Sequence, residues 1–314
     1  MVNYTDLTEK EIANFGELFN LGSVKDFHLL KGGSTNSNFL LITEKEKYVL
    51  TICEDQTFEQ IRPLMALLQH LEAQNFHTSK VLKSHSGEFL LETDNNPVYL
   101  KSYIEGQVPR KLSLTSLEHL GIMIAKLHKI QVLDCIPDAY QYGLTYFADV
   151  TTSSSSHPFM DWLNQKSQFL EEHLPNDLPR GLVHGDIFTD NLVEGTHGQI
   201  IIIDFEAASH SPFIFDIGMA LIGVCSEKNT ISFRKAKALI KGYQQEREFN
   251  QMEKNGIKLF ANYAATATAF WRFRLFHLRI PTLKRFNRYQ QMVAIADSLV
   301  QIKNSIFMKQ VGLG

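Results

Sequence analysis

The stretch LVHGDIFTDNL, residues 182–192, places a histidine, two aspartates and an asparagine close together among apolar residues. The run IIIIDFEAA, residues 200–208, follows it, and its apolar part ends at another acid, Asp204. The four isoleucines have the length and composition of a buried strand. A strand holds a charged residue at its end rigidly while the side chain meets solvent. The two stretches therefore predict a polar site next to a buried strand.

The spacing of these polar residues matches the needs of phosphoryl transfer. That reaction needs a carboxylate to accept or orient the proton of the attacking hydroxyl, and carboxylate and amide oxygens to hold Mg²⁺. The protein-kinase catalytic loop supplies an aspartate and an asparagine five residues later, as Asp186 and Asn191 do here. Taken singly, Asp186 and Asn191 could sit in a turn and Asp204 could cap a helix. Taken together, the three favour a site that uses ATP and Mg²⁺.

Length and composition describe the kind of protein. The chain has 314 residues, 44% of them apolar and 21% charged, with a formal net charge of -3. A nucleic-acid binder usually carries a concentrated basic surface, so the charge argues against nucleic acid as a partner. No apolar run approaches the ~20 residues that span a bilayer, which argues against a membrane partner. Three widely spaced cysteines suggest free thiols in a reducing compartment, and we expect a cytoplasmic protein.

The pattern of residues changes along the chain. Residues 24–54 are rich in Val, Ile, Leu, Phe and Thr and predict three strands, with turns at residues 32–33 and 44–46. Apolar residues at helical spacing between residues 58 and 76 predict one helix, and further short strands follow up to about residue 106. Beyond residue 114 helical spacing dominates. We therefore predict a strand-rich N-lobe (1–102), a connector near 103–110, and a larger helical C-lobe (103–314).

The motif resembles that of the aminoglycoside phosphotransferase and choline kinase superfamily, which has a bilobal protein-kinase-like fold. The resemblance implies an α+β fold with a small antiparallel-sheet N-lobe that binds nucleotide and a mostly helical C-lobe that binds the acceptor. It makes Asp186 the catalytic base, and Asn191 and Asp204 the magnesium ligands. It implies that His184 holds the loop and that Asp216 buttresses it from below.

The turn LLKGGSTNSNFLL, residues 29–41, is the predicted phosphate contact. Glycines let the backbone approach a phosphate, and hydroxyls can donate to its oxygens, although a plain hairpin turn would use the same residues. Protein kinases also place a lysine on the third strand. Here Thr51 occupies that position, so another cation takes the role or the activity is weak. The expected nucleotide contacts are Gly32, Gly33, Ser34, Thr35, Lys101 and Tyr103.

Within the superfamily, the chain is most similar to the bacterial type II homoserine kinases. The similarity extends over most of the chain, including YTDLTEKEIANF, YVLTICE, LMALLQHL, LPRGLVHGDIFTDNL, KALIKGYQ and AFWRFRLFH. Homoserine is a zwitterion, so its site needs a cation and an acid. Arg274, or else Arg272 or Arg279, could bind the carboxylate. Glu206 or Asp190 could bind the ammonium group.

Other segments depart from the homoserine kinases. The turn GGSTNSN is more like that of choline kinases, and FEAASHSPFIFDIG is closer to choline, methylthioribose or aminoglycoside kinases. The alternatives are therefore a kinase for one of these acceptors or for a protein hydroxyl, or a nucleotide-binding module without catalysis. A quaternary ammonium group would need an aromatic box, for which the candidates are Tyr103, Trp162, Trp271 and Phe273. The expected partner is a small hydroxylated molecule, and the sequence gives no oligomeric state.

Overall fold

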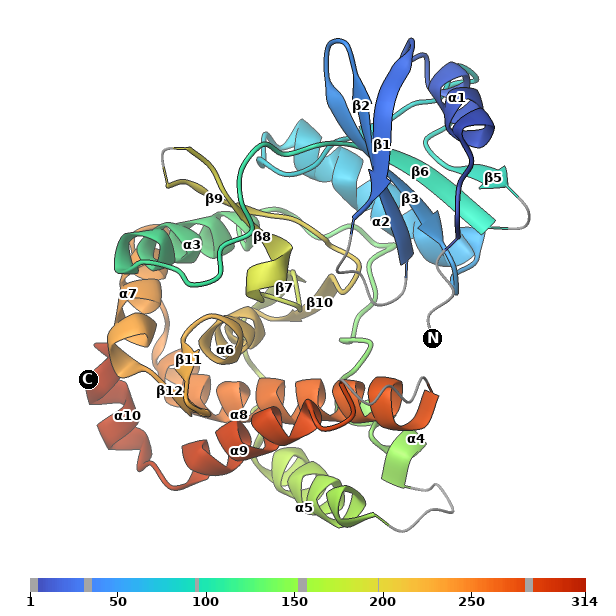
Figure 1. Cartoon of the computed structure of the whole chain (residues 1–314). Helices are drawn as coiled ribbons and strands as arrows, with labels where there is room; N and C mark the ends of the chain where they lie inside the picture. Colours follow the sequence, from blue (N-terminus) through green and yellow to red (C-terminus); the bar gives the residue numbers. More distant parts are fainter. Residues whose placement is uncertain (1–4, 31–35, 94–95, 152–156, 197, 280–284) are drawn as a thin grey trace. The chain divides into compact units, whose positions relative to one another are not determined.

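The structure is a computed structural model, and it describes residues 5–30, 36–93, 96–151, 157–196, 198–279 and 285–314. The predicted phosphate turn, Gly32, Gly33, Ser34 and Thr35, lies outside the described residues. The chain divides into two compact units, Val2–Gly106 and Gln107–Gly314. The first unit contains a large sheet and the second is mainly helical (Figure 1). The division falls within the segment 103–110.

The first unit is an antiparallel sheet with two helices. Its strands lie in the order β1-β2-β3-β6-β4, and β5 pairs with β6. A capping box at Thr8 starts α1. The elements are α1 (Glu9–Leu18), β1 (Val24–Leu29), β2 (Asn36–Thr43), β3 (Lys47–Cys53), α2 (Phe58–Ala73), β4 (Val81–Leu82), β5 (Leu91–Thr93) and β6 (Asn96–Ser102).

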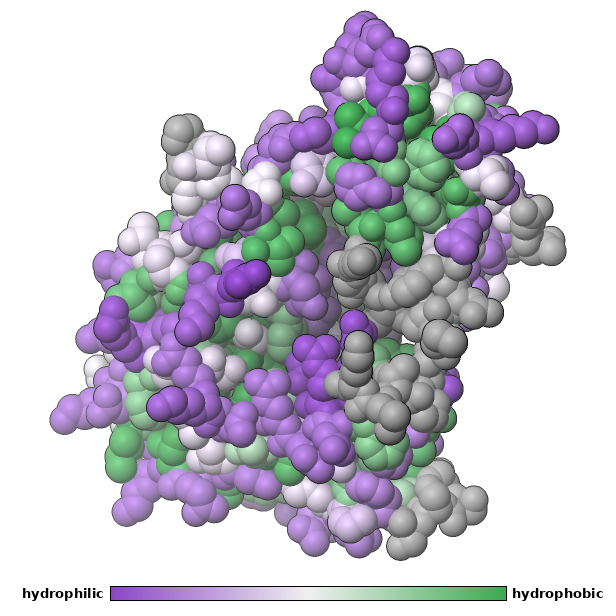
Figure 2. Space-filling view, viewed as in Figure 1, coloured by the Kyte–Doolittle hydropathy of each residue, from purple (hydrophilic) through white to green (hydrophobic). Residues whose placement is uncertain are grey.

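The two faces of this sheet differ in character. One face carries an apolar core that includes Leu50 and Leu100, a directly paired couple on β3 and β6, and it packs against residues of α1. The opposite face carries Thr51, paired with Tyr99, because successive residues of a strand point to opposite sides. Figure 2 shows apolar residues gathered over β1 and its neighbouring strands. The Thr51 position therefore belongs to the more polar face.

The second unit surrounds short strand pairs with helices. The strands form three antiparallel pairs among the described residues, β7 with β10, β8 with β9 and β11 with β12. The elements are α3 (Leu114–Leu127), η1 (Leu144–Tyr146), α4 (Ala148–Thr151), α5 (Pro158–His173), β7 (Arg180–Val183), η2 (Thr189–Asn191), β8 (Leu192–Glu194), β9 (Ile200–Ile202), β10 (Ser209–Pro212), α6 (Ile214–Gly223), β11 (Ser226–Glu227), β12 (Thr230–Ile231), α7 (Phe233–Gln244), α8 (Gln251–Phe273), the π-helical turn η3 (Arg274–Arg279), α9 (Tyr289–Val300) and α10 (Asn304–Val311).

Two glycines let the helices α3 and α7 pack with their backbones in contact. A Cβ atom on Gly242 would lie 1.9 Å from the carbonyl oxygen of Glu118, and one on Gly121 would lie 2.1 Å from that of Leu239. Neither position can accept a side chain unless the helices move apart. This contact fixes the C-terminal end of α3, where His128 lies.

The exterior of the second unit is largely hydrophilic on the face that Figure 2 shows, with smaller apolar areas between. Among the described residues, no helix combines the length and the apolar character that crossing a bilayer requires.

Candidate active site

The polar residues of the opening motif lie in the loop between β7 and β8, residues 184–191 (loop 184–191). The pairing of β7 with β10 fixes one end of the loop, and the pairing of β8 with β9 fixes the other. β8 starts directly after Asn191, and Asp204 comes two residues after β9 ends. Because β8 and β9 are antiparallel, Asn191 and Asp204 stand at the same end of the pair. The backbone N–H of Ile203 donates to the Asn191 carbonyl at 3.0 Å and holds them there.

Asp186 and Asn191 are in direct contact. The Asn191 Nδ2 donates to the Asp186 carboxylate at 2.7 Å and to the Asp186 backbone oxygen at 2.9 Å. Both partners are acceptors, which determines the orientation of the amide. The amide oxygen, Oδ1, is therefore left to serve as a ligand for a cation.

The Asp186 carboxyl is more basic than an ordinary aspartate. Burial is the largest cause, and the negative charges of Asp204 and Asp190 add to it, against the Asn191 hydrogen bond and the charge of Arg272. Together these effects raise the pKa of Asp186 to about 7. A general base is most effective when its pKa lies near the working pH. Of the neighbouring charges, those of Asp204 and Asp190 raise this pKa and that of Arg272 lowers it.

Asp204 has an unusual backbone conformation. Its φ is 69°, in the left-handed region, which costs a residue other than glycine about 1–3 kcal/mol. The residue is exposed, so its carboxylate remains accessible at the end of β9. Strain of this kind persists where the surrounding structure requires it, and it is concentrated at functional sites.

His184 and Asp216 hold the loop from inside. The His184 Nε2 donates to the Ile203 carbonyl at 3.0 Å, and its Nδ1 accepts from the Asp186 backbone N–H at 3.1 Å. Burial lowers the pKa of His184, consistent with this neutral form. The fully buried Asp216 accepts from the backbone N–H groups of His184 and Gly185, each at 2.7 Å. The backbone that leads into Asp186 is therefore fixed by a buried charge.

Gly185 is required by two independent constraints. Its φ is 80°, and a Cβ atom would lie 2.6 Å from the Ala207 carbonyl oxygen and 3.2 Å from the Tyr140 ring. Glycine is the residue that tolerates both. The Tyr140 ring therefore lies directly against loop 184–191.

The sequence analysis did not find Tyr142. Its ring centroid lies 6.0 Å from that of Trp271, and the neighbouring Gln141 Nε2 donates to the Glu206 carbonyl at 3.2 Å. Burial, together with the charges of Asp186 and Glu206, raises the pKa of Tyr142 to about 12. The signal in the sequence is weak: the stretch AYQYG has aromatic residues in a loop without any periodic pattern.

Comparison with known proteins gives this site its context. Residues 26–252 match the model of the Phosphotransferase enzyme family. The chain belongs to that family. This chain is therefore a kinase of the phosphotransferase family, and the predicted relationship to aminoglycoside and choline kinases is confirmed.

Individual relatives agree with this assignment. A homoserine kinase of Agrobacterium fabrum is 28% identical over 284 residues, with 88% of each chain covered. An amicoumacin kinase solved with AMP-PNP, Ca²⁺ and Ami has a TM-score of 0.74 at 18% identity, covering 95% of this chain and 97% of that one. The choline kinase of Streptococcus pneumoniae has a TM-score of 0.69 at 16% identity, covering 93% and 100%. The predicted α+β, protein-kinase-like fold is confirmed.

The charges of the predicted acceptor residues act on Asp186 or on Tyr142. Asp190 is exposed in η2, and its charge acts on Asp186. Arg274 binds Asp149 through its Nη2 at 3.0 Å, and its charge acts on Tyr142. We call Tyr142, Glu206, Trp271 and Arg274 the Tyr142 cluster.

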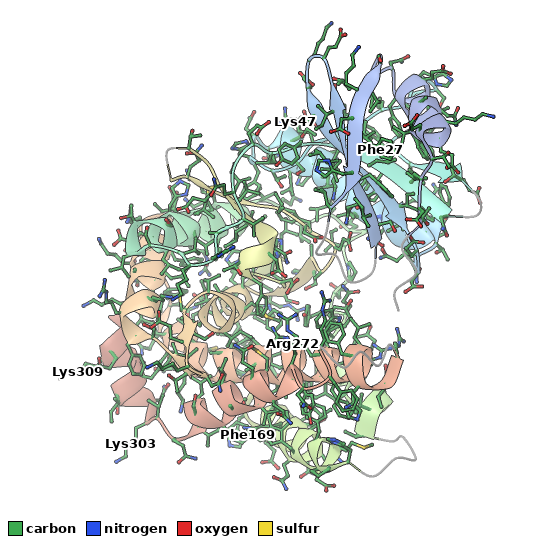
Figure 3. All side chains as sticks on the ribbon, in the orientation of Figure 1. Phe27, Lys47, Phe169, Arg272, Lys303 and Lys309 are labelled. Carbon is green, nitrogen blue, oxygen red and sulfur yellow. The ribbon has the colours of Figure 1, made fainter. Side chains whose placement is uncertain are left out.

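Arg272, labelled at α8 in Figure 3, lies next to loop 184–191. Its guanidinium lies 5.7 Å from the ring centroid of Phe188, a residue of that loop. Burial lowers the pKa of Arg272 to about 10, against the charges of Asp186 and Asp190. At neutral pH it remains a cation beside the anionic residues of the site.

Two candidates for the aromatic box lie elsewhere in the second unit. Trp162 donates to the Asp297 carboxylate at 3.0 Å, and Phe273 is buried and stacked on Phe159 at 4.4 Å. They contribute to packing around α5. Trp271 is the candidate that lies beside Tyr142.

The remaining predicted nucleotide contacts lie in the first unit. Lys101 is on β6, with its Nζ 5.3 Å from the ring centroid of Tyr99. Tyr103 follows β6, and its ring lies 5.5 Å from the Nζ of Lys47. Lys47 forms an ion pair with Glu105 at 2.8 Å.

Proposed function

We propose that this kinase transfers a phosphoryl group from ATP to the hydroxyl of a small charged metabolite, with homoserine as the first candidate. The observation that carries the proposal is the direct contact of Asp186 with Asn191, at the end of the β8–β9 pair where Asp204 also stands. In this proposal Asp186 is the base, and Asn191 and Asp204 are the metal ligands that phosphoryl transfer needs.

A divalent cation fits the residues present. The Asn191 Oδ1 and the Asp204 carboxylate offer the hard oxygen ligands that Mg²⁺ prefers. Asp186 is buried, and the negative charges of Asp204 and Asp190 act on it. A cation bound by Asn191 and Asp204 would relieve that repulsion, and it would supply charge neutralisation of the phosphates.

Asp186 would act on the acceptor hydroxyl. Its carboxylate is held by Asn191, and the loop backbone before it is held by Asp216, so it has little freedom to turn away. It would accept a hydrogen bond from the hydroxyl, orient its oxygen and take its proton. Arg272 would attract the phosphate oxygens or the acceptor's carboxylate, because it is a half-buried cation whose charge acts on Asp186.

The first unit would bind the nucleotide. Lys101 shares the polar face of the sheet with Thr51, since Val49 pairs with Lys101 and Thr51 pairs with Tyr99. A cation on this face could contact phosphates where protein kinases use their third-strand lysine. Tyr103 and the turn Gly32, Gly33, Ser34 and Thr35 remain the other proposed nucleotide contacts.

The Tyr142 cluster supports an amino-acid acceptor. Glu206 and Arg274 both influence the Tyr142 hydroxyl, and they carry opposite charges. A zwitterion needs an acid for its ammonium group and a cation for its carboxylate. Asp190, on loop 184–191, offers a second acid. The name of the Agrobacterium fabrum relative favours homoserine among such acceptors.

A second candidate is an amino alcohol such as choline. The Tyr142 and Trp271 rings stand at 57° to each other beside Glu206, and rings in this arrangement can bind a quaternary ammonium group. The choline kinase of Streptococcus pneumoniae shares the fold. An acceptor without a carboxylate would leave Arg274 paired with Asp149 alone.

The test is ADP release by the purified protein with MgATP and a panel of acceptors: L-homoserine, L-serine, choline, ethanolamine, 5-methylthioribose and kanamycin. We expect the highest kcat/KM with L-homoserine. Asp186→Asn should lower kcat by a factor between about 10² and 10⁴ while the fold persists, because the hydroxyl loses its base. Removing divalent cations with EDTA should abolish turnover.

Asp177→Asn is the matched control, because Asp177 is an exposed aspartate in the same unit outside the site. Its kcat should equal that of the wild type. Unchanged turnover in Asp186→Asn would reject the catalytic assignment. A response to kanamycin alone would replace the metabolic acceptor with an antibiotic, and ATP binding without ADP release on any acceptor would favour a non-catalytic module.

A further inference from the structure

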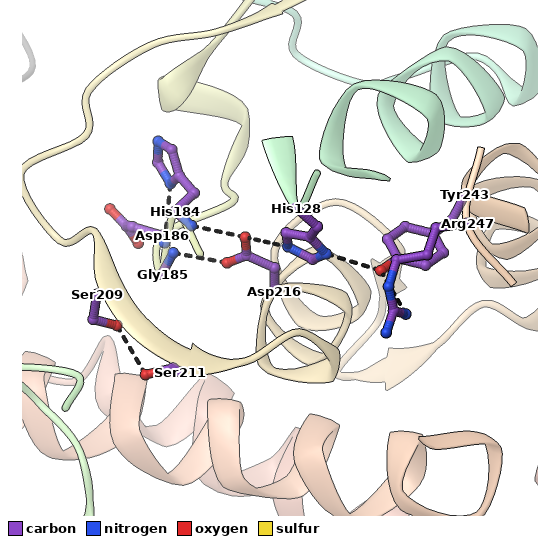
Figure 4. A network of polar contacts seen from close by, with 9 residues as sticks. All are labelled: His128, His184, Gly185, Asp186, Ser209, Ser211, Asp216, Tyr243 and Arg247. Carbon is purple, nitrogen blue, oxygen red and sulfur yellow. Dashed lines mark hydrogen bonds and ion pairs between the residues drawn. The ribbon is translucent and has the colours of Figure 1, made fainter. Parts of the chain in front are cut away.

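A line of buried polar side chains continues from Asp216 away from loop 184–191 (Figure 4). The His128 Nε2 lies 3.1 Å from the Asp216 carboxylate, and its Nδ1 lies 2.8 Å from the Tyr243 hydroxyl. The Arg247 Nη1 donates to the same Tyr243 oxygen at 3.1 Å. These residues come from the ends of α3, α6 and α7, far apart in the sequence. The nucleotide and acceptor roles assigned above use none of His128, Tyr243 and Arg247.

The partners determine the direction of every hydrogen bond in this line. Asp216 is an acceptor, so the His128 Nε2 carries a proton and donates to it. Burial lowers the pKa of His128, so the ring is neutral and its Nδ1 accepts. The Tyr243 hydroxyl must then donate to His128, and its oxygen is free to accept from Arg247. The line therefore runs from a permanent cation to the carboxylate that holds the loop.

The outer end of the line is also fixed. Arg247 forms an ion pair with Glu253 at 2.8 Å, and its guanidinium lies 4.5 Å from the Phe213 ring centroid. Glu253 is buried and completes the capping box of α8 with Asn250. The start of α8 is thus tied to Arg247, and through the line to Asp216.

We propose that Arg247, Tyr243 and His128 form a positioning relay that fixes the orientation of the His128 ring and thereby holds Asp216, His184 and Gly185 in the geometry that aims Asp186. The relay residues touch no substrate and act only through Asp216. The consequence for turnover rests on the proposed function, whereas the consequence for the hydrogen bonds of His128 does not. A small displacement of a catalytic group can cost about 10²-fold in rate, so the relay would matter for kcat.

The first experiment measures the tautomer directly by ¹⁵N NMR of the full-length protein labelled at histidine. His128→Gln assigns the His128 resonances by their loss. We expect the wild type to show the neutral Nε2–H form at His128. Tyr243→Phe removes the donor to Nδ1 but keeps the ring that stacks on Phe249 at 4.6 Å. The His128 Nδ1 resonance should then shift towards that of an imidazole nitrogen without a hydrogen bond, while the Nε2–H that Asp216 holds remains.

The second experiment compares the kcat values of the variants and the wild type. The substrates are MgATP and the best acceptor of the panel, or MgATP alone, in which case water accepts the phosphoryl group. Tyr243→Phe should lower kcat about ten-fold or more, with each KM within about two-fold of the wild type. His128→Gln retains an N–H donor for Asp216 and should keep more kcat than His128→Leu. Thr266→Val is the matched control, because it removes a buried hydroxyl that donates to Asn262 within α8. It should lower stability and leave kcat unchanged.

The outcomes separate the two proposals. A wild-type protein without turnover on any acceptor would reject the proposed function, and the ¹⁵N result would still decide the relay. A His128 Nδ1 resonance that stays unchanged in Tyr243→Phe would overturn the relay. So would a kcat in Tyr243→Phe equal to that of the wild type, or a loss no larger than in Thr266→Val.

Discussion

At the scale of single residues, the site combines groups whose properties come from their neighbours. Asp186 becomes basic because burial and two nearby acids disfavour its charged form, and Asn191 keeps it oriented. Tyr142 becomes a weaker acid because it is buried beside Asp186 and Glu206. These changes are electrostatic, so they depend on distances that the order of residues does not reveal.

The Tyr142 cluster leads to a prediction about the acceptor. Tyr142→Ala should raise the KM for the acceptor about ten-fold or more and leave the KM for ATP within about two-fold of the wild type, because only ground-state binding of the acceptor is lost. Steady-state kinetics at saturating MgATP would show this. Tyr146→Ala is the control, since Tyr146 is an exposed tyrosine nearby. Equal KM values in Tyr142→Ala and the wild type would remove Tyr142 from the acceptor site.

Lys101 leads to a prediction about the nucleotide. Lys101→Met keeps the length of the side chain but loses the charge, so the KM for ATP should rise about ten-fold while the acceptor KM stays nearly constant. Lys80→Met, at an exposed lysine in an ion pair with Glu72, should change neither value. An ATP titration followed by ADP release provides the measurement. If Lys101→Met bound ATP as the wild type does, another group would have to replace the third-strand lysine.

At the scale of secondary-structure elements, much of the structure follows local patterns. The three strands over residues 24–53, the helix from residue 58 and the helix from residue 114 lie where periodicity predicted them. Asp186 and Asn191 lie in a single loop, so their spacing can be recognised in the sequence. The close contact of α3 with α7 has no such signal, because a glycine in a helix looks the same whether or not another backbone lies against it.

The α3–α7 contact gives a prediction about stability. Gly242→Ala places a Cβ atom 1.9 Å from a backbone oxygen, so the free energy of unfolding should fall by about 3 kcal/mol. Gly256→Ala is the matched control in α8, where the new Cβ would meet only the flexible end of Ile214 at 2.8 Å. The free energy of unfolding of Gly256→Ala should stay within about 1 kcal/mol of the wild-type value, because alanine favours the helix. Urea unfolding of both variants provides the measurement, and equal values would show that α3 can shift.

At the scale of the whole molecule, buried neutral histidines connect stability to pH. Burial lowers the pKa values of His128 and His184 in the folded protein, whereas unfolded histidines titrate near ~6.5. Below that pH the unfolded state binds more protons, so stability falls as pH falls, by up to about 1.4 kcal/mol per pH unit for each histidine. Asp186 acts in the opposite direction between about pH 7 and 4, because its raised pKa lets the folded state bind the proton first.

The prediction is a loss of stability from pH 7.5 to pH 5.5 that is larger in Asp186→Asn than in the wild type. That variant removes the opposing contribution and leaves the two histidines. Urea unfolding without nucleotide or divalent cation provides the measurement at both pH values. An equal or smaller loss in Asp186→Asn would contradict the assignment of these protonation states.

The sequence by itself determined the class of protein, the strands of the first unit and the group Asp186, Asn191 and Asp204. It could do so because these features depend on residues that are close along the chain, through periodicity, turn chemistry and a fixed interval in one loop. Only the tertiary structure placed Tyr142 beside Asp186, and joined His128 to Asp216 and to Tyr243. The two hydrogen bonds of His128 span 88 and 115 residues, and they form only when the helices pack, because packing removes water and brings their ends together.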